Sequence, residues 1–165
     1  MNALFIGRFQ PLHNGHLKVI QESSKKYDEI IIGIGSSQYG HALDNPFTGV
    51  ERKKMINETL KKEGINNYKI ILIPDIHNPP KWVDHVLKII SDFDIVISNN
   101  SQTLDLFAEK GYKTCKTPLY NEKVFSGQEI RRRIIDDDKW QDLVPNTISD
   151  LIIKIKGVNR LKNLE

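Results

Sequence analysis

The segment from Gly7 to His16 gathers groups that can bind an anion. Arg8, His13 and His16 occur within ten residues, directly after an apolar run and directly before a stretch of helical periodicity. Two histidines three positions apart project from one face of a helical turn, near the helix end that carries a positive partial charge. Either histidine alone is more simply interpreted as polar surface. Together with the free backbone N–H groups of a helix N-terminus, the three side chains predict a phosphate-binding site.

The same segment differs from the two commonest nucleotide-binding loops. It has neither the Gly-x-Gly-x-x-Gly pattern of dinucleotide oxidoreductases nor the Gly-Lys-Ser or Gly-Lys-Thr ending of P-loop ATPases. Its small and cyclic residues have local uses, because Gly7 lets a ligand approach the backbone, Pro11 stiffens the turn and Gly15 permits close packing at a helix start. Both of those enzyme classes are therefore disfavoured.

A second group of donors lies near the other end of the sequence. Ser126 and Glu129 have the spacing of a capping box, which predicts a helix that begins at Gly127 with the arginines 131–133 in its early turns. Positive side chains near a helix N-terminus are disfavoured, by about 0.3–1 kcal/mol each, unless an anion is bound there. The alternative is a set of surface arginines that pair with the aspartates 136–138. If an anion does bind at this helix N-terminus, the arginines form a second phosphate-binding element.

A third segment, Asp75–Trp82, follows a predicted strand and contains Asn78 and two prolines. Trp82 has two interpretations. It covers the sheet as a core residue, or it stacks on a flat ring at the mouth of a rigid loop. Asn78 would then hydrogen-bond an amide of the same ligand.

The elements that must position these groups alternate along the chain. β-Branched runs predict strands at 2–6, 29–35, 68–73, 94–98 and 113–116. Amphipathic stretches predict helices at 15–26, 49–63, 81–91, 103–110, 127–137 and 147–156. The alternation predicts an α/β, Rossmann-like, doubly wound parallel sheet of about five strands, with helices on both faces and helices at the C-terminal end. The length of 165 residues and the absence of an internal repeat predict one domain, residues 1–165.

Several local features support these ranges. Thr48 and Glu51 form a second capping-box pattern, and Gly64 suits the left-handed position after the same helix. The basic tail, residues 154–162, is expected to be a solvated surface helix.

Composition excludes several classes of partner. The 24 Lys and Arg exceed the 21 Asp and Glu by only three, which is too little to require a nucleic acid. The single cysteine, Cys115, closes no intramolecular disulfide and builds no zinc site, and no apolar run approaches the length of a membrane span. We therefore expect a cytoplasmic protein with no nucleic-acid or membrane partner.

The two donor-rich segments also resemble known motifs. Gly7–His16 resembles the His-x-Gly-His signature of the nucleotidyltransferase superfamily, which includes cytidylyl- and adenylyltransferases, and Ser126–Arg131 resembles its Ser-x-x-x-x-Arg element. Other pieces are similar to archaeal-type nicotinamide-nucleotide adenylyltransferases: Gly35–Gln38, Asn45–Thr48, Glu51 with Arg52, Trp82 with Val83, and Ile155–Arg160. The resemblance covers almost the full length. Gln128 replaces the usual Thr of the second motif, and Ser98-Asn-Asn100 stands where Ser-Gly-Asn is usual.

The resemblance implies a reaction and a set of residues for it. A phosphate oxygen of nicotinamide mononucleotide (NMN) attacks the α-phosphorus of ATP, giving NAD and pyrophosphate. The implied catalytic residues are Arg8, His13, His16 and Arg131. The implied ATP-binding residues are Gly7, Arg8, Phe9, His13, Gly15, His16, Ser98, Asn100, Ser126, Gly127 and Arg131, and the implied NMN-binding residues are Gln10, Asn78 and Trp82. The resemblance further implies Mg²⁺ held by ATP rather than by a protein cage, and a homohexamer.

Two alternatives stay open at the level of sequence. One is a sibling transferase that acts on pantetheine phosphate, FMN or glycerol phosphate. The other is a nucleotide sensor or RNA-binding module without turnover, which the complete set of His and Arg residues disfavours.

Overall fold

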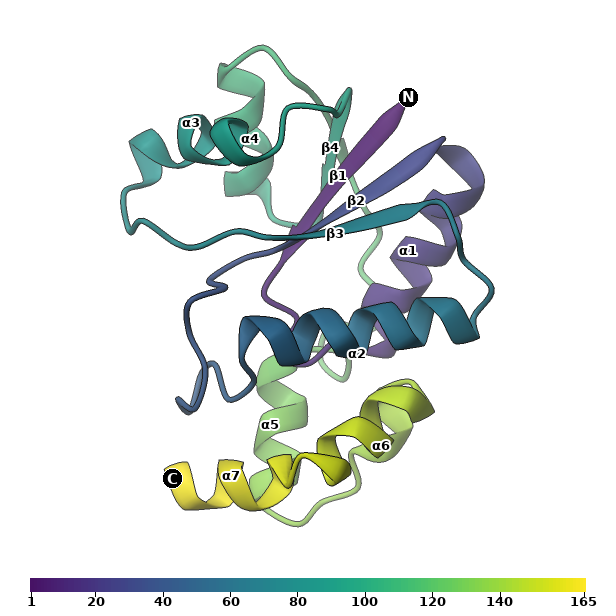
Figure 1. Cartoon of the computed structure of the whole chain (residues 1–165), viewed down its shortest axis with the longest axis vertical. Coiled ribbons are helices and arrows are strands. Elements are labelled where there is room, and N and C mark those ends of the chain that lie inside the picture. Colours follow the sequence, from purple (N-terminus) through teal and green to yellow (C-terminus); the bar gives the residue numbers. More distant parts are fainter.

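Five parallel strands form the centre of the computed structural model, which describes residues 1–165 (Figure 1). The strands are β1 (Asn2–Gly7), β2 (Glu29–Ile34), β3 (Tyr68–Leu72), β4 (Ile95–Ser98) and β5 (Lys113–Lys116). They lie in the order β3-β2-β1-β4-β5, and each neighbouring pair is parallel. The predicted α/β, Rossmann-like sheet is confirmed.

This strand order creates a crevice at one place. The chain winds outward from β1 through β2 to β3, then crosses back to β4 on the other side of β1. Connections leave β1 and β4 in opposite directions, so that a gap opens beyond their carboxyl ends. Open α/β sheets bind ligands at this switch point.

Helices cover both faces of the sheet. They are α1 (Asn14–Lys26), α2 (Gly49–Lys62), α3 (Pro79–Ile89), α4 (Ser101–Glu109), α5 (Gly127–Ile135), α6 (Asn146–Lys154) and α7 (Gly157–Leu164). A larger core packs α1, α2 and α5 to α7 on one face, and a smaller core packs α3 and α4 on the other (Figure 1). Successive residues of β1 alternate between them, since Ala3 and Phe5 join the larger core and Leu4 the smaller. Each predicted strand and helix range agrees with the structure to within two residues.

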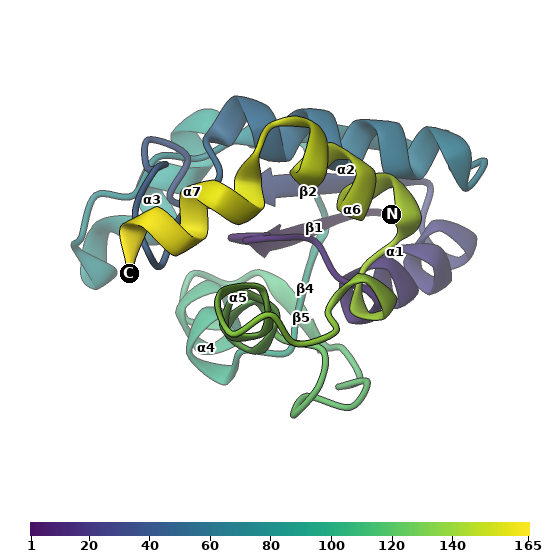
Figure 2. The ribbon, with the colours of Figure 1, turned by 90° about the horizontal axis from the view of Figure 1, so that it is seen from below.

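The prediction for the tail is wrong. Residues 154–162 do not form one solvated helix, because Lys156 adopts a left-handed conformation (φ 58°) that ends α6 and starts α7. Gly157 and Leu161 are buried, and α6 packs against α2, while α7 packs against α5 and α6 (Figure 2). The tail is therefore part of the larger core.

One further result concerns membranes. None of the helices is sufficiently long and apolar to span a bilayer.

Candidate active site

A cavity of about 700 Å³ opens at the carboxyl ends of β1 and β4. Its wall contains residues from the loop after β1, the start of α1, the ends of β2 and β4, the loop 117–125 and the start of α5. This volume is in the range of sites for small molecules such as nucleotides. The two donor-rich segments, which lie more than a hundred residues apart in the sequence, share this cavity.

His13 and His16 form the N-terminal cap of α1. The Nδ1 atom of His13 accepts the N–H of His16, and the Nδ1 atom of His16 accepts the N–H of His13, each at 3.2 Å. The two rings stack with their centroids 3.6 Å apart. Because Nδ1 is an acceptor in both rings, the proton of each neutral ring resides on Nε2, which leaves two N–H donors for a ligand.

Burial keeps both rings neutral in the free protein. It lowers the pKa of His13 to about 4, and burial together with the nearby His13 lowers the pKa of His16 well below its usual range. A bound phosphate would reverse this tendency, since a negative charge favours the protonated ring.

Arg131 links the two signatures directly. Its side chain is buried, and Nη1 donates to the backbone carbonyl of Gln10 at 2.9 Å. A Cβ atom at Gly127 would lie 2.8 Å from that Nη1 and 3.1 Å from the Gln10 oxygen, so this close packing requires glycine. Burial and the positive charge of Arg8 lower the pKa of Arg131, which is partly offset by Asp44.

The six arginines fall into two groups. Arg132, Arg133 and Arg160 each pair with a carboxylate. Arg8, Arg52 and Arg131 have no carboxylate partner, and Arg8 and Arg131 line the cavity. The cavity therefore contains two guanidinium groups whose charge is free for an anion.

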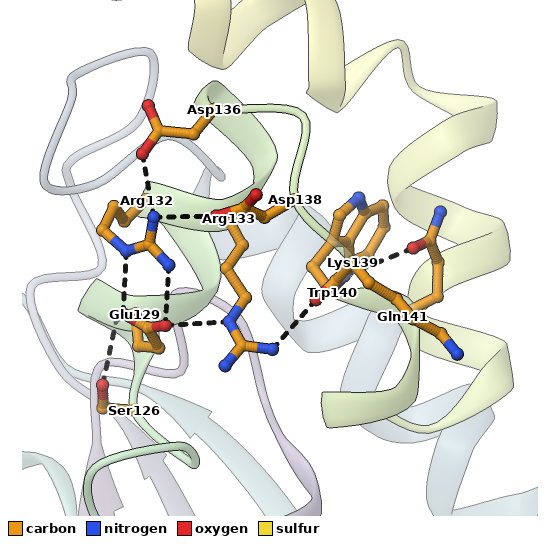
Figure 3. Close-up of polar contacts among 9 residues, drawn as sticks. All are labelled: Ser126, Glu129, Arg132, Arg133, Asp136, Asp138, Lys139, Trp140 and Gln141. Atoms are coloured by element: carbon orange, nitrogen blue, oxygen red, sulfur yellow. Dashed lines mark hydrogen bonds and ion pairs between the residues drawn. The ribbon is translucent and has the colours of Figure 1, made fainter.

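The arginine cluster divides between the protein surface and the cavity. Arg132 pairs with Glu129, Asp136 and Asp138, and Arg133 also binds Glu129, at 2.8 Å (Figure 3). Hydrogen bonds from these two arginines lower the pKa of Glu129 to about 2. The surface-pair interpretation is thus correct for two arginines, whereas Arg131 turns into the cavity.

Two expectations for α5 are wrong. The helix ends at Ile135, so Arg132 and Arg133 lie in its last turn, where the helix dipole favours them. The capping box is also only half formed. Ser126 Oγ accepts the Glu129 N–H at 3.1 Å, but the Glu129 carboxylate faces the arginines instead of the Ser126 N–H (Figure 3). By contrast, both halves of the Thr48–Glu51 box are present, and Gly64 is left-handed as expected.

The loop after β1 contains a strained residue. Phe9 is buried with φ 51°, a conformation that costs a bulky residue about 1–3 kcal/mol. Its ring packs so closely on Gly7 that a Cβ there would lie 3.0 Å from the ring. Ser36, at the end of β2, is strained in the same way, with φ 47°, and also lines the cavity.

Gln10 lines the cavity, but its side-chain amide is already bound. Oε1 accepts the Phe47 N–H at 3.0 Å, and Nε2 donates to the Phe47 carbonyl at 2.8 Å. Its backbone carbonyl holds Arg131. Gln10 thus joins the cavity wall to the segment before α2 and to α5.

The residues predicted to contact NMN are not all at the cavity. Trp82 lines it and also packs against Phe107 in a T-shaped arrangement, with ring centroids 5.6 Å apart, so it has a core contact and a position at the cavity. Asn78 is exposed at the start of α3, its side chain makes no cap, and it lies outside the cavity wall. The structure therefore does not bring Asn78 to the other predicted residues.

On the opposite side, the end of β4 contributes three residues. Ser98 is buried and its Oγ accepts the Asn100 N–H at 3.0 Å, while the Asn100 side chain caps α4 through the Thr103 N–H. Asn99 is exposed and lines the cavity with them. Apart from Asn78, all the predicted site residues lie in the cavity wall.

Sequence reasoning missed other residues of the wall. Ser36 and Asp75 follow β2 and β3, and the rule that parallel strands meet at their carboxyl ends would have indicated both. The loop that contains Tyr120 and Glu122 carries no such signal. No group of three or more His, Cys, Asp or Glu side chains is arranged to hold a metal ion.

Comparisons with known proteins agree on one family. A family model described as cytidylyltransferase-like matches residues 4–133. A nicotinamide-nucleotide adenylyltransferase of Methanococcus aeolicus is 51% identical over 164 residues, which are 99% of this chain and 95% of the relative. A protein of the same name from Thermococcus sibiricus is 45% identical, over 99% of this chain and 89% of the relative.

A solved structure is similar over the full chain. It is a bifunctional NMN adenylyltransferase/ADP ribose pyrophosphatase from Francisella tularensis, complexed with AMP and a Mn ion. It is 26% identical with a TM-score of 0.81, and the match covers 99% of this chain and 51% of that one. The present chain thus spans about half of the bifunctional protein.

Proposed function

The chain belongs to the nicotinamide-nucleotide adenylyltransferase family, and from that premise we propose that the cavity beyond β1 and β4 is its active site. The enzyme transfers AMP from ATP to NMN, giving NAD and pyrophosphate in NAD biosynthesis. One observation carries the placement of the site. The His-x-Gly-His segment and the arginine-bearing helix α5 line a single cavity and are joined by the Arg131–Gln10 hydrogen bond.

The chemistry needs no general base. The attacking group is a phosphate oxygen of NMN, which is already an anion. It forms a bond to the α-phosphorus of ATP as the bond from that phosphorus to the bridging oxygen breaks, and pyrophosphate leaves with the electron pair. The protein must therefore align two anions and stabilise the charge that develops between them.

The donors of the cavity suit that task. In the proposed mechanism His13 and His16 donate from Nε2 to the phosphates of ATP, with His16 nearest the α-phosphate. Arg8 and Arg131 hold the flanking phosphates. The remaining proposed ATP contacts are Gly7, Phe9, Gly15, Ser98, Asn100, Ser126 and Gly127, all of which lie in the same wall.

The acceptor occupies the side of the cavity that contains Trp82. We propose that the indole stacks on the nicotinamide ring while it keeps its T-shaped contact with Phe107. Gln10 supports this pocket through its bonds to Phe47 and Arg131. Asn78 is left out, because it does not reach the wall.

Mg²⁺ fits this site as an ion coordinated by the phosphates of ATP. The acidic residues of the wall are Asp75 and Glu122, too few for a protein cage, so phosphate and water oxygens would supply most of its ligands. When bound, Mg²⁺ neutralises phosphate charge.

The proposal extends to the whole protein. We propose that residues 1–165 act as one nucleotidyltransferase domain, in the cytoplasm and as a homohexamer. The length of 165 residues without an internal repeat supports the single domain, the composition supports the cytoplasm, and the resemblance to the archaeal-type enzymes supports the homohexamer.

An acceptor panel tests the proposed function. Pyrophosphate release from ATP is measured with NMN, pantetheine phosphate, FMN or glycerol phosphate as the acceptor. We expect release with NMN alone, and quenching of tryptophan fluorescence by NMN but not by the other three. Release with another acceptor would identify a sibling transferase, and no release with any acceptor would indicate a binding module.

A further inference from the structure

Arg52 is a fully buried cation that the reaction described above does not use. It lies in the first turn of α2 and is the largest completely buried side chain of the protein. No carboxylate pairs with it, and its immediate neighbour Glu51 binds Arg160 instead. A buried charge without an opposite charge is unfavourable unless every donor is satisfied, so this arginine calls for a functional explanation.

Backbone carbonyls accept hydrogen bonds from all the nitrogen atoms of the Arg52 guanidinium, which is called the fork below. Nε donates to the carbonyl of Thr48, the N-cap of its own helix, at 3.2 Å. Nη1 donates to the carbonyls of Arg8 at 2.8 Å and Gly35 at 2.9 Å. Nη2 donates to those of Ser36 at 3.0 Å and Tyr39 at 3.2 Å. The five N–H groups thus have five acceptors, four of them in the loops that follow β1 and β2.

Those two loops form one wall of the cavity, and both are strained. Phe9 and Ser36 are left-handed, with φ 51° and 47°. Arg52 binds the carbonyl of the residue before Phe9 and the carbonyl of Ser36 itself. Left-handed residues other than glycine persist only where surrounding contacts hold them. The fork therefore holds the backbone from which the Arg8 side chain extends towards the cavity.

Arg52 has the same positive charge as the two arginines that line the cavity. Burial and the nearby Arg8 lower the pKa of Arg52 to about 10, so it stays protonated at neutral pH. Arg8 in turn also repels Arg131. A bound triphosphate attracts all three arginines and so offsets the repulsion among them. A neutral residue at position 52 would not contribute to the attraction of the triphosphate.

We propose that Arg52 is a positioning residue for ATP: its fork fixes the two strained loops after β1 and β2 and thereby sets the Arg8 guanidinium against the triphosphate. This inference rests on the proposed function only in naming ATP as the anion. It assigns Arg52 no contact with the substrate.

The substitution Arg52→Lys tests the fork while it keeps the charge. One ammonium can still reach the two carbonyls that Nη1 holds, but it cannot also reach those that Nη2 holds, at Ser36 and Tyr39. We expect the dissociation constant of ATP, measured by calorimetry without NMN, to rise about tenfold, and kcat/KM for ATP to fall by about 10²-fold, as is typical of a misplaced binding group. Unchanged ATP binding by a folded Arg52→Lys protein would overturn the proposal.

A second substitution tests the mechanism itself. Ser36→Gly removes the need to hold position 36, because glycine adopts positive φ without strain. The double variant Arg52→Lys with Ser36→Gly should recover most of the lost ATP affinity. If Arg52→Lys alone does not fold, the double variant must regain both the circular dichroism of the native protein and ATP binding. Failure of Ser36→Gly to restore ATP binding contradicts the proposal in either case.

Arg160→Lys is the matched control. Arg160 also binds a backbone carbonyl and a charged group near the start of α2, but it lies outside the cavity. Its replacement by lysine should leave the dissociation constant of ATP within twofold of the wild-type value, and a loss equal to that of Arg52→Lys would contradict the proposal. Because the dissociation constants are measured with ATP alone, they remain decisive even if the acceptor panel shows no turnover with NMN.

Discussion

His13 and His16 illustrate how a short motif combines structure with chemistry. The Nδ1 atoms close the N-terminus of α1, and the Nε2 atoms remain as donors. A histidine in this arrangement can neither rotate freely nor adopt the other neutral tautomer without losing its cap. The two rings are therefore set for a ligand before it binds, which is the condition for efficient stabilisation of a developing charge.

At His16 we expect a large effect on the rate. The substitution His16→Ala removes one donor from the transition state and should lower kcat by about 10²–10³-fold, with a smaller effect on the dissociation constant of ATP. Steady-state pyrophosphate release, together with calorimetry, measures both. The control is His41→Asn, because His41 is exposed outside the cavity and Asn tolerates its left-handed backbone. If His16→Ala turned over at nearly the original rate, its proposed role would be wrong.

At His13 the lowered pKa predicts a dependence of stability on pH. The ring in the unfolded chain takes up a proton near pH 6.5, whereas the folded protein resists it until the pH is about 4. The unfolded state therefore gains protons first, and the free energy of unfolding falls as the pH falls between these values. Above pH 6.5 this ring has no effect. The loss amounts to about 2 kcal/mol by pH 5.

The substitution His13→Asn isolates that effect. Asparagine is a good N-cap residue, so it keeps the hydrogen bond to the His16 N–H but does not titrate. Urea unfolding at pH 7 and pH 5 should show a smaller loss of stability in the variant than in the wild type. Equal losses would mean that His13 does not titrate as described.

At the scale of elements, the sequence predicted the helices better than their ends. Periodicity located α5, but it does not record where the chain leaves the helix, at Asp136 and the left-handed Asp137 (φ 59°), or the ion pairs of Glu129 with Arg132 and Arg133. Those pairs left the capping box half formed, and the end of the helix at Ile135 places both arginines in a favourable last turn. Asn78 was misplaced for a similar reason, because turn chemistry identified its loop but not the direction of the side chain.

The tail shows the same limit. Its basic residues suggested a solvated helix, yet Arg160 pairs with Glu51 at 2.8 Å and donates to the Pro46 carbonyl at 2.9 Å. Burial raises the pKa of Glu51, but hydrogen bonds from Arg160 and from the Thr48 N–H lower it on balance. A contact between residues 109 positions apart leaves no pattern in a single sequence.

The ion pair between Arg160 of α7 and Glu51 of α2 should contribute to the free energy of unfolding. The substitution Arg160→Ala should lower the free energy of unfolding by about 1–3 kcal/mol, since it leaves a half-buried carboxylate without its partner. Glu51→Gln removes the charge and keeps the capping box. In the double-mutant cycle of these two changes, measured by urea unfolding, we expect a coupling of about 1 kcal/mol, and additive effects would show that the pair contributes nothing.

At the scale of the whole molecule, the order of strands explains why the site could be predicted at all. The first signature directly follows β1, whose carboxyl end lies at the switch point, and the loop 117–125 leads from β5, beside β4, to the second signature in the same cavity. The role of Arg52 could not be predicted in this way. It depends on carbonyl positions that exist only once both loops have folded.

The hydrogen bond between Arg131 and Gln10 joins residues 121 positions apart. A ribosome that has completed the first signature must therefore synthesise most of the remaining protein before the donor from α5 exists. Nascent chains that stop earlier, and fragments cut within the loop 117–125, lack the α5 residues that are proposed to bind the triphosphate. Incomplete copies should accordingly be inert rather than weakly active, so that they consume no ATP.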